Sequence, residues 1–444
     1  MKFIKTISQT TVIQGISVLF EFASSVILVR YLGPLNYGIY TAVFIIPNLV
    51  TGLGALGLGP SIIYFSGRKV FNLWSIFYFA TIVGLTLSII YLLVFYGLSE
   101  LIYKYVFTER IEVILILMAS LIIPLNLFNK FSRAILRGIG KVNAFTLSSI
   151  LLPTVLRFSL ICIFIIFLEK GVTGAIFIPI VSVFISTIVV ISLVIFYIQT
   201  EHKKNNMLNV GQIKEFLSYG LKFWLGSAIK KSDSGIILLV VTYFSSLENL
   251  AFFRLGYSLA NMSTKAKSII DIVSVSKIVS SDTDLIKKQY PQLFRFITIF
   301  IIILLFIGNL LIAPTINIIY GNEFSATINI FRILLPGLLL LQFISIANQV
   351  KAYTGNPLYV SKVRSFGLIT NISLLLILVP YYSIYGASFS ILIANLIMFI
   401  VSVYFMRSFF KISTADLLFF KKQDVDLINE LVLKVRTKLR NNNE

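Results

Sequence analysis

The stretch RYLGPLNYGIY, residues 30–40, separates two long apolar runs and decides how the rest of the chain is read. The runs at 7–29 and 38–63 are each long enough to cross a bilayer, which takes about 20 apolar residues in a helix. The Gly33–Pro34 pair between them is a strong turn signal. The stretch therefore predicts a hairpin that joins two membrane-spanning helices, with Gly33, Pro34, Gly38 and Tyr40 as its characteristic residues.

The composition extends this reading to the whole chain of 444 residues. Hydrophobic residues make up 57% and charged residues only 13%, whereas a soluble domain is about a quarter charged. Apolar runs and charged gaps predict an all-α polytopic membrane protein with about twelve transmembrane helices. The expected spans are 7–29, 38–63, 71–97, 112–130, 144–168, 174–198, 218–245, 250–275, 293–319, 326–350, 363–381 and 386–408.

The net charge of +20 follows from Lys and Arg in the short gaps between spans. Such residues mark the cytoplasmic side of a membrane protein, so nucleic acid is excluded as a partner. The odd-numbered gaps hold only Arg30, Lys104, Arg110 and Lys170. We therefore expect both termini in the cytoplasm of a bacterial cell, in a multi-pass protein of the inner membrane.

An internal repeat relates the two halves of the chain. Pro124 and Gly174 return as Pro336 and Gly386 at the same offset of 212 residues, and LNYGIY from Leu35 returns as LENLAF from Leu247. Six spans followed by six equivalent spans indicate a parallel repeat around a central cavity, as in alternating-access transporters. The predicted domains are an N-terminal lobe 1–208, a C-terminal lobe 209–410 and a cytoplasmic basic amphipathic tail 411–444.

Charged side chains inside the predicted spans are the candidate functional residues, because they are costly in a bilayer and usually functional. Arg254, Tyr257, Asn261 and Lys265 recur at spacings of three and four, which places them on one helical face. Basic residues outnumber acidic ones in these spans, which predicts a cavity that receives an anion. The predicted substrate-binding residues are Arg157, Lys230, Lys231, Arg254, Lys265 and Arg332.

Carboxylates in the same spans have two interpretations. Glu21 and Asp233 are the predicted sites for a coupling Na⁺ or H⁺, with Asn371 as a further oxygen ligand. Alternatively, Asp233 neutralises Lys230 three residues away. The glycines of the second span, at 52, 54, 57 and 59, are compatible either with tight helix packing or with a gating hinge.

The residue inventory argues against catalysis. One Cys and one His do not supply a catalytic triad, a zinc site or a thiolate cluster, and the chain lacks a P-loop motif. We expect neither an enzyme nor a bound cofactor or metal, apart from a coupling ion.

The segment VRYLGPLNYGIYTAVFIIPNL and the later DSGIILLVVTYFSSLENLAFF resemble the Wzx-type polysaccharide flippases, over essentially residues 1–410. This family belongs to the multidrug/oligosaccharidyl-lipid/polysaccharide exporter superfamily. The resemblance implies a flippase for undecaprenyl-diphosphate-linked oligosaccharides of O-antigen or capsule, working among membrane lipids and other glycan-assembly proteins. The family's usual arginine after Asp233 is Ser234 here, so Lys230 or Lys231 would have to supply that charge.

Three other functions remain as alternatives to a polysaccharide flippase. They are a multidrug exporter, an exporter of another lipid-linked precursor such as lipid II, and a membrane glycan polymerase or ligase. A multidrug exporter of cations would need an acidic cavity, whereas a polymerase or ligase would need sizeable outer loops.

Overall fold

The structure of the chain is a computed structural model that describes residues 2–107, 110–199, 208–262, 283–353, 358–419, 421 and 424, without the side chains of 2–11, 225–227, 229–233, 283–289, 352, 353, 358 and 361. Within these residues every regular element is a helix. Eight helices there are long and apolar enough to cross a membrane. The predicted all-α membrane architecture is confirmed.

The Gly33–Pro34 turn forms as the sequence predicts. Helix α1, Lys2–Val43, is interrupted at Gly33, whose φ of 68° lies in the left-handed region, where glycine avoids the strain of a Cβ. Pro34 then opens the second arm, a position that suits its fixed φ. Helix α15, Leu358–Phe410, is interrupted in the same way at Ser383, with a φ of 50°. Each continuous helix is therefore a hairpin of two spans.

The contacts of the chain divide it into two units, and the first comprises residues 1–255, 315–327 and 374–387. After α1 it contains α2 (Ile45–Gly54), α3 (Leu58–Gly67), α4 (Leu73–Leu101), η1 (Ile102–Val106), α5 (Val113–Ser120), α6 (Ile122–Gly138), α7 (Val142–Thr146), η2 (Leu147–Leu151), α8 (Leu152–Ile161), η3 (Cys162–Phe167), α9 (Gly171–Gln199), α10 (Val210–Phe244), the first part of α11 (Leu247–Met262), η5 (Thr315–Tyr320) and η6 (Asn322–Phe324).

The second unit comprises residues 256–314, 328–373 and 388–444. It holds the end of α11, α13 (Thr283–Pro314), most of α14 (Ala326–Tyr353), α15 apart from its turn region 374–387, and the short α16 (Thr414–Leu418). Phe343 of α14 packs against Phe294 and Phe399 at ring separations of 4.5 and 4.9 Å. These units cut across the predicted lobes, so the boundaries at 208 and 410 stay a prediction.

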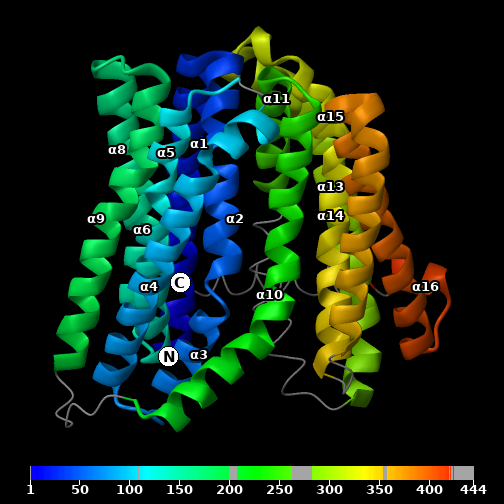
Figure 1. Cartoon of the computed structure of the whole chain (residues 1–444). Coiled ribbons are helices and arrows are strands. Elements are labelled where there is room, and N and C mark those ends of the chain that lie inside the picture. Colours follow the sequence, from blue (N-terminus) through cyan, green and yellow to red (C-terminus); the bar gives the residue numbers. More distant parts are fainter. Residues whose placement is uncertain are drawn as a thin grey trace, which may run out of the picture. The chain divides into compact units, whose positions relative to one another are not determined.

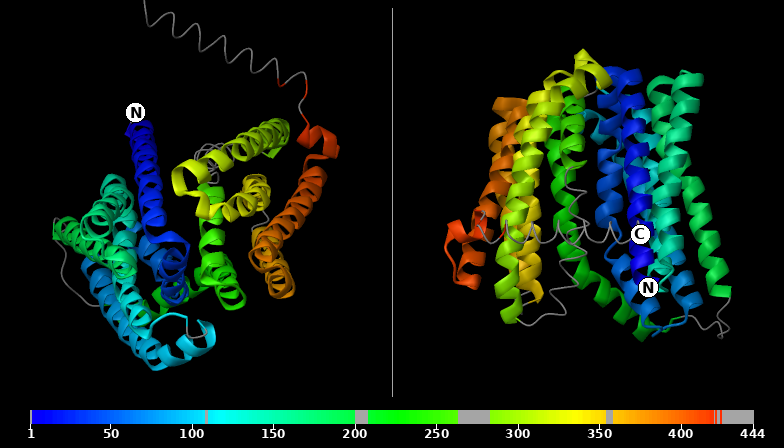
Figure 2. Two further views of the ribbon diagram at one scale, coloured as in Figure 1. Left: turned by 90° about the horizontal axis from the view of Figure 1, so that it is seen from above. Right: turned by 180° about the vertical axis from the view of Figure 1, so that it is seen from behind.

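Helix α6 is central to the packing of the first unit. It lies against α3, α4 and α9, while α10 lies against α2 and α3 (Figures 1 and 2). Along the α10 contact, the Ser61 hydroxyl donates to the Phe216 carbonyl at 2.9 Å, and the Trp224 indole donates to the Leu53 carbonyl at 2.6 Å. These bonds fix the register of α10 on the glycine-rich second span.

The glycines of that span differ in role. A Cβ at Gly57 would overlap the backbone carbonyl of Gly220 in α10, whereas a Cβ at Gly59 would meet open space. Gly57 also has a φ of 72°, at the break between α2 and α3. Tight packing against α10 therefore explains Gly57. The break between α2 and α3 lies at the point where this span comes closest to α10.

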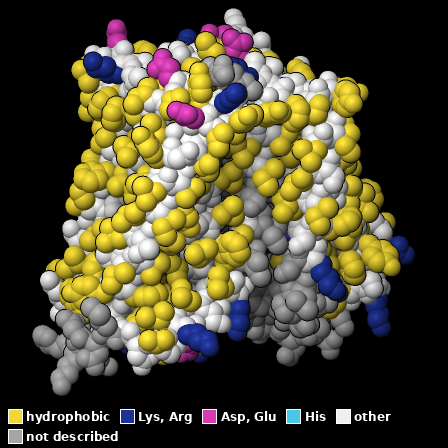
Figure 3. Space-filling model, in the orientation of Figure 1, with side chains coloured by type: hydrophobic (Ala, Val, Ile, Leu, Met, Phe, Trp, Pro, Cys, Tyr) yellow, Lys and Arg dark blue, Asp and Glu magenta, His cyan; other side chains and the backbone are white. Residues whose placement is uncertain are grey.

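The surface matches a membrane span. Figure 3 shows hydrophobic side chains over the length of the helices and charged side chains gathered toward the helix ends. Two predicted span ends are wrong: the span that was expected to end at 97 continues to Val106, and the one expected to end at 130 continues to Gly138. Arg133 and Arg137 had marked a gap, but they lie on the helix itself.

Candidate functional site

The structure brings one predicted hairpin residue and one predicted cation together. Arg157 of α8 donates from Nη2 to the Tyr40 hydroxyl at 2.6 Å. Tyr40 stacks on Tyr37 with ring centroids 6.0 Å apart and planes 23° from parallel. Tyr37 is buried and lies within electrostatic range of both Arg157 and Arg254. We call Tyr37, Tyr40, Arg157 and Arg254 the Tyr37 cluster.

The Tyr37 cluster keeps unused hydrogen-bonding capacity. The Nε of Arg157 is buried and has no hydrogen-bond partner, which is costly for a donor on a cation unless another group occupies the site. A second cation, Arg254, lies within electrostatic range of the same tyrosine. The cluster can therefore accept an anionic or hydroxyl-rich group.

The second predicted hairpin packs directly on the first. A Cβ on Gly38 would overlap the backbone of Leu247 at the start of α11. Leu247 is also the first residue of LENLAF, the segment that the repeat pairs with LNYGIY. Gly38 is therefore needed for close approach of the two hairpins, which places Arg254 of α11 near Tyr37.

Further bonds join the ends of the hairpins that the sequence predicts to face outward. Arg110 donates to the carbonyls of Ser245 and Thr242, at 2.6 and 2.8 Å. Ser245 shares a hydroxyl hydrogen bond of 2.7 Å with Ser383 at the turn of α15. We call Arg110, Ser245 and Ser383 the outer seal, because it connects the first half of the chain to a hairpin of the second half.

Helix α1 makes a second connection between the two halves of the chain. The Ser25 and Tyr320 hydroxyls lie 3.4 Å apart, and Phe22 meets the Tyr320 ring edge-on at 6.2 Å. Tyr320 ends η5, next to the hairpin that leads into α14. Two separate hairpins of the second half are thus attached to the first half within one unit.

Three other predicted residues, Glu21, Arg332 and Asn371, lie elsewhere in the structure. Glu21 is exposed on α1, while the neighbouring Ser17 and Ser24 are buried. Arg332 is exposed on α14 and Asn371 is buried in α15, and both belong to the second unit. They are not part of the Tyr37 cluster.

The remaining predicted residues cannot be placed as side chains. Lys230, Lys231 and Asp233 lie on α10, but their side chains are outside the described residues, and Lys265 is outside them entirely. Their roles stay predictions.

Sequence reasoning missed a cavity of about 520 Å³ between α2, α3 and α6. Its polar lining includes three carboxamides and three cations: Asn48, Asn126, Asn129, Lys130, Arg133 and Arg137. Residues 126, 130, 133 and 137 recur at spacings of four, three and four, the signature of one helical face. That signal was present in the sequence, but Arg133 and Arg137 were interpreted only as markers of topology.

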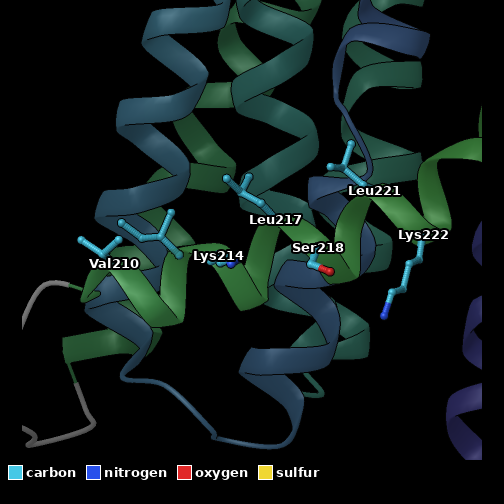
Figure 4. Close-up of a pocket in the computed structure, with 7 residues that line it drawn as sticks. Val210, Lys214, Leu217, Ser218, Leu221 and Lys222 are labelled. Atoms are coloured by element: carbon cyan, nitrogen blue, oxygen red, sulfur yellow. The ribbon is translucent and has the colours of Figure 1, made fainter.

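A larger hollow of about 610 Å³ lies along the first turns of α10 and is lined by residues of that helix alone. Figure 4 shows Val210, Leu217 and Leu221 beside Lys214, with the side chain of Lys222 extending away from the ribbon. Since polar groups from different elements do not converge on it, we do not assign it as the site.

Comparison with known proteins gives a family match and several similar folds. The family described as "Polysaccharide biosynthesis protein" matches residues 27–329 of the chain. No curated protein matches the sequence.

Three solved structures illustrate the fold. An inward-facing multidrug resistance MATE family transporter of the MOP superfamily is 17% identical, with 89% of this chain and 94% of that chain covered and a TM-score of 0.74. A MOP superfamily transporter from Pyrococcus furiosus, for which a reversed polarity of the binding pocket suggests a different function, is 18% identical, with 92% and 95% covered and a TM-score of 0.64. The lipid II flippase MurJ, in an inward closed conformation, is 15% identical, with 92% and 90% covered and a TM-score of 0.65.

The family and the fold agree with the resemblance that the hairpin motif suggested. MATE and MurJ proteins have a two-lobed fold of twelve helices, and the superfamily they represent is the one inferred from RYLGPLNYGIY. The chain therefore belongs to the polysaccharide biosynthesis protein family and has the transporter fold of the multidrug/oligosaccharidyl-lipid/polysaccharide exporter superfamily.

Proposed function

We propose that the chain is a flippase that moves an undecaprenyl-diphosphate-linked oligosaccharide from the cytoplasmic to the outer leaflet of the bacterial inner membrane. It works by alternating access, and the glycan is a repeat unit of O-antigen, capsule or a related polymer. The description of the matching family supports a role in polysaccharide biosynthesis, and the fold supports transport rather than catalysis.

The observation that carries the proposal is the outer seal with the Tyr37 cluster close to it. Alternating access requires a state in which one side of the membrane is closed while the substrate site is formed. Arg110, Ser245 and Ser383 supply hydrogen bonds that close the predicted outer end. Arg110 and Ser383 are half-buried, whereas Thr242 and Ser245 are buried, and these hydrogen bonds have to break for the outer end to open.

The chemistry of the cluster favours an anionic, hydroxylated substrate. A lipid diphosphate must carry its negative charge across about 30 Å of hydrocarbon, and nearby guanidinium groups offset the loss of hydration. Arg157 and Arg254 supply such groups, and the half-buried Tyr40 supplies a ring suited to sugars. Lys230, Lys231, Lys265 and Arg332 are proposed to continue this cationic path.

Multidrug export is the second candidate, because MATE transporters are among the similar folds. Cationic drugs would be repelled by Arg157 and Arg254, which counts against it. A lipid II-like precursor also carries a diphosphate, so that alternative differs only in the glycan. The identity of the sugars is not fixed by these contacts.

For energy coupling, we propose that Na⁺ or H⁺ binds at carboxylates within the spans. Asp233 and Glu21 are the candidates, with Asn371 as an oxygen ligand. The Asp233→Asn variant keeps the side-chain volume and removes the charge, so it should slow flipping and abolish its dependence on an ion gradient.

The direct test is flipping by purified protein in proteoliposomes that contain a polyprenyl-diphosphate-linked oligosaccharide. The Arg157→Gln variant removes the cation that Tyr40 holds. A charged hydrogen bond is worth about 1.5–3 kcal/mol, so we expect flipping to slow about tenfold to a hundredfold.

A matched control exists in the same chain. Arg68 also donates to a tyrosine, Tyr64, at 3.0 Å, but this pair is exposed on one helix end. Arg68→Gln should flip at the wild-type rate. If wild-type protein moves a cationic dye but not the lipid-linked glycan, multidrug export is the correct function and the flippase proposal is wrong.

A further inference from the structure

The span that carries Arg157 changes its helical register on both sides of this residue. The segments η2 and η3 are π-helical turns, and α8 with Arg157 lies between them. In a π turn the backbone hydrogen bonds join residues five apart instead of four, and such turns are frequent at functional sites. The N–H of Leu152 accordingly donates to the carbonyl of Leu147. The orientation of α8 therefore depends on the register of η2.

Pro153 leaves the Ser148 carbonyl without a backbone donor in this register. The residue five positions after Ser148 is Pro153, and proline has no N–H. In an α-helical register the Ser148 carbonyl would accept from the N–H of Leu152, and the Ser149 carbonyl would lose its donor to Pro153 instead. Each register thus lacks one backbone hydrogen bond, so side chains from other spans decide which of the two is more stable.

Side chains of α6 and α9 donate to the Ser148 carbonyl. The Nη2 of Arg133, on α6, and the hydroxyl of Ser186, on α9, each lie 3.3 Å from this oxygen. Arg133 also donates to the Ser186 hydroxyl at 3.1 Å. Ser148 is buried, and a buried carbonyl without a donor is costly. The two side chains therefore stabilise the π register of η2.

The junction between η2 and α8 is held at a second point. The Ser182 hydroxyl, one turn before Ser186 on α9, donates to the carbonyl of Pro153 at 3.1 Å. Asn129 of α6 donates to Ser186 and Thr187 at 3.3 and 3.0 Å. Helix α9 is thus fixed to α6 and holds both ends of the junction, so the donors of the Ser148 carbonyl have a defined position.

The register of η2 determines the direction of the Arg157 side chain. Conversion of the π turn to an α turn removes one residue from that turn, which rotates α8 by about 100° around its axis and shifts it by about 1.5 Å. In the π register, α8 packs against α1 and α9 (Figure 1), and Arg157 donates to the Tyr40 hydroxyl at 2.6 Å. A rotation of this size would turn the guanidinium away from Tyr40.

We infer that Arg133 is a positioning residue for the Tyr37 cluster. By donating to the Ser148 carbonyl it keeps η2 in the π register and orients Arg157 toward Tyr40. In this role Arg133 acts through the backbone of the span and needs no contact with the substrate. The inference rests on the proposed function only for what Arg157 binds.

The first test measures the register and needs no transport. Cys162, the single cysteine of the chain, directly follows α8 and is half-buried, so a trifluoromethyl label on its sulfur reports rotation of α8 in a fluorine NMR spectrum of detergent-solubilised protein. Arg133→Met keeps the length of the side chain but removes the charged donor. It should shift the ratio of the two registers about tenfold, seen as a second resonance.

Two variants show whether the donor of residue 133 is responsible. Arg133→Lys keeps a charged donor and should restore most of the wild-type resonance. Lys141→Gln neutralises an exposed cation at the start of the same span, where it lies over the Tyr197 ring, and should give the wild-type spectrum. An unchanged spectrum in Arg133→Met, or the same second resonance in Lys141→Gln, would overturn the inference.

Pro153→Ala tests the register without removing a charge. Alanine restores an N–H, which the α register uses fully at the Ser149 carbonyl, whereas in the π register Arg133 already satisfies the Ser148 carbonyl. Pro153→Ala should therefore favour the α register and give the same second resonance as Arg133→Met. If Arg133→Met does not fold, Pro153→Ala decides, and a wild-type spectrum in that variant shows that the inference is wrong.

The second test connects the register to flipping in proteoliposomes. Arg133→Met should slow flipping by up to about tenfold, and the double variant with Arg157→Gln should be no slower than Arg157→Gln alone, because one residue acts through the other. Multiplied losses would mean that Arg133 acts by another route, which contradicts the inference. If the spectra change as expected but wild-type protein flips no lipid-linked glycan, the positioning of Arg157 stands and the proposed function fails.

Discussion

Arg110 provides the sharpest test of the outer seal. Its guanidinium donates to the last carbonyls of α10, those of Thr242 and Ser245, and its Nε donates to Phe107 in its own loop at 3.2 Å. The carbonyls at a helix C-terminus carry partial negative charge, which a cation stabilises. Replacing Arg110 by Gln removes the charge and both bonds to α10.

The magnitude follows from these bonds. Two charged hydrogen bonds would contribute about 3–6 kcal/mol if fully buried. Arg110 is only half-buried, and burial lowers its pKa from the ordinary value, which indicates a desolvation cost that opposes the gain. We therefore expect the closed outer end to lose about 1–3 kcal/mol in Arg110→Gln. This loss corresponds to a shift of roughly fivefold to a hundredfold toward the open form, since 1.4 kcal/mol is a factor of ten.

The assay is labelling of a single cysteine by an impermeant maleimide applied from outside. Cys162 is replaced by Ser, and Ser25 next to Tyr320 is replaced by Cys as the reporter. In that background Arg110→Gln should label roughly fivefold to a hundredfold faster than the parent, whereas Lys104→Gln should not change the rate. Equal rates for Arg110→Gln and the parent would refute the outer seal, and labelling only from the inside would refute the predicted orientation.

Two further predictions concern packing and pH. Gly57→Ala should lower the free energy of unfolding of detergent-solubilised protein by about 2–4 kcal/mol, because a positive φ and an overlap with α10 are both unfavourable. Gly59→Ala, whose Cβ meets open space, should be neutral. Equal melting temperatures for the two variants would contradict the packing of Gly57 against α10. Arg295 and the buried Asp424 form a bidentate ion pair at 2.6 and 2.8 Å, which holds the pKa of Asp424 below its ordinary value of 3.8. The stabilisation by Asp424 is therefore present above pH 3.8 and lost as the pH falls through its depressed pKa. Amide exchange near α16 should accelerate as the pH falls through that pKa, and also in Asp424→Asn at pH 7. Asp416→Asn, whose ion pair with Lys421 is exposed, should leave the exchange rate unchanged.

The fold was predictable because its signals are local. Apolar runs set the spans, and the Gly33–Pro34 turn sets a hairpin because glycine tolerates the left-handed backbone there and proline begins a helix. The motif around this turn also identified the family. By contrast, the end of the fourth span was misplaced, since Arg133 and Arg137 look like gap residues when only hydropathy is read.

The candidate site, like the fold, could be predicted from the sequence only in part. The sequence singled out Arg157 and Arg254 as charges within the spans and Tyr40 as a residue of the hairpin motif, but it did not show that Arg157 hydrogen-bonds Tyr40. That bond joins residues 117 positions apart, and no local pattern encodes such a pairing.

The sequence by itself determined the membrane class, the hairpins and the family, because burial in a bilayer and backbone conformation depend on residue type and near neighbours. Only the tertiary structure decided that Gly57 serves packing against α10, that Arg110 donates to the carbonyls of Thr242 and Ser245 at the end of α10, and that the α6 cations line a cavity. The physical reason is that these features depend on which side chains meet across spans that are distant in the sequence, and residue type and near neighbours do not specify those contacts.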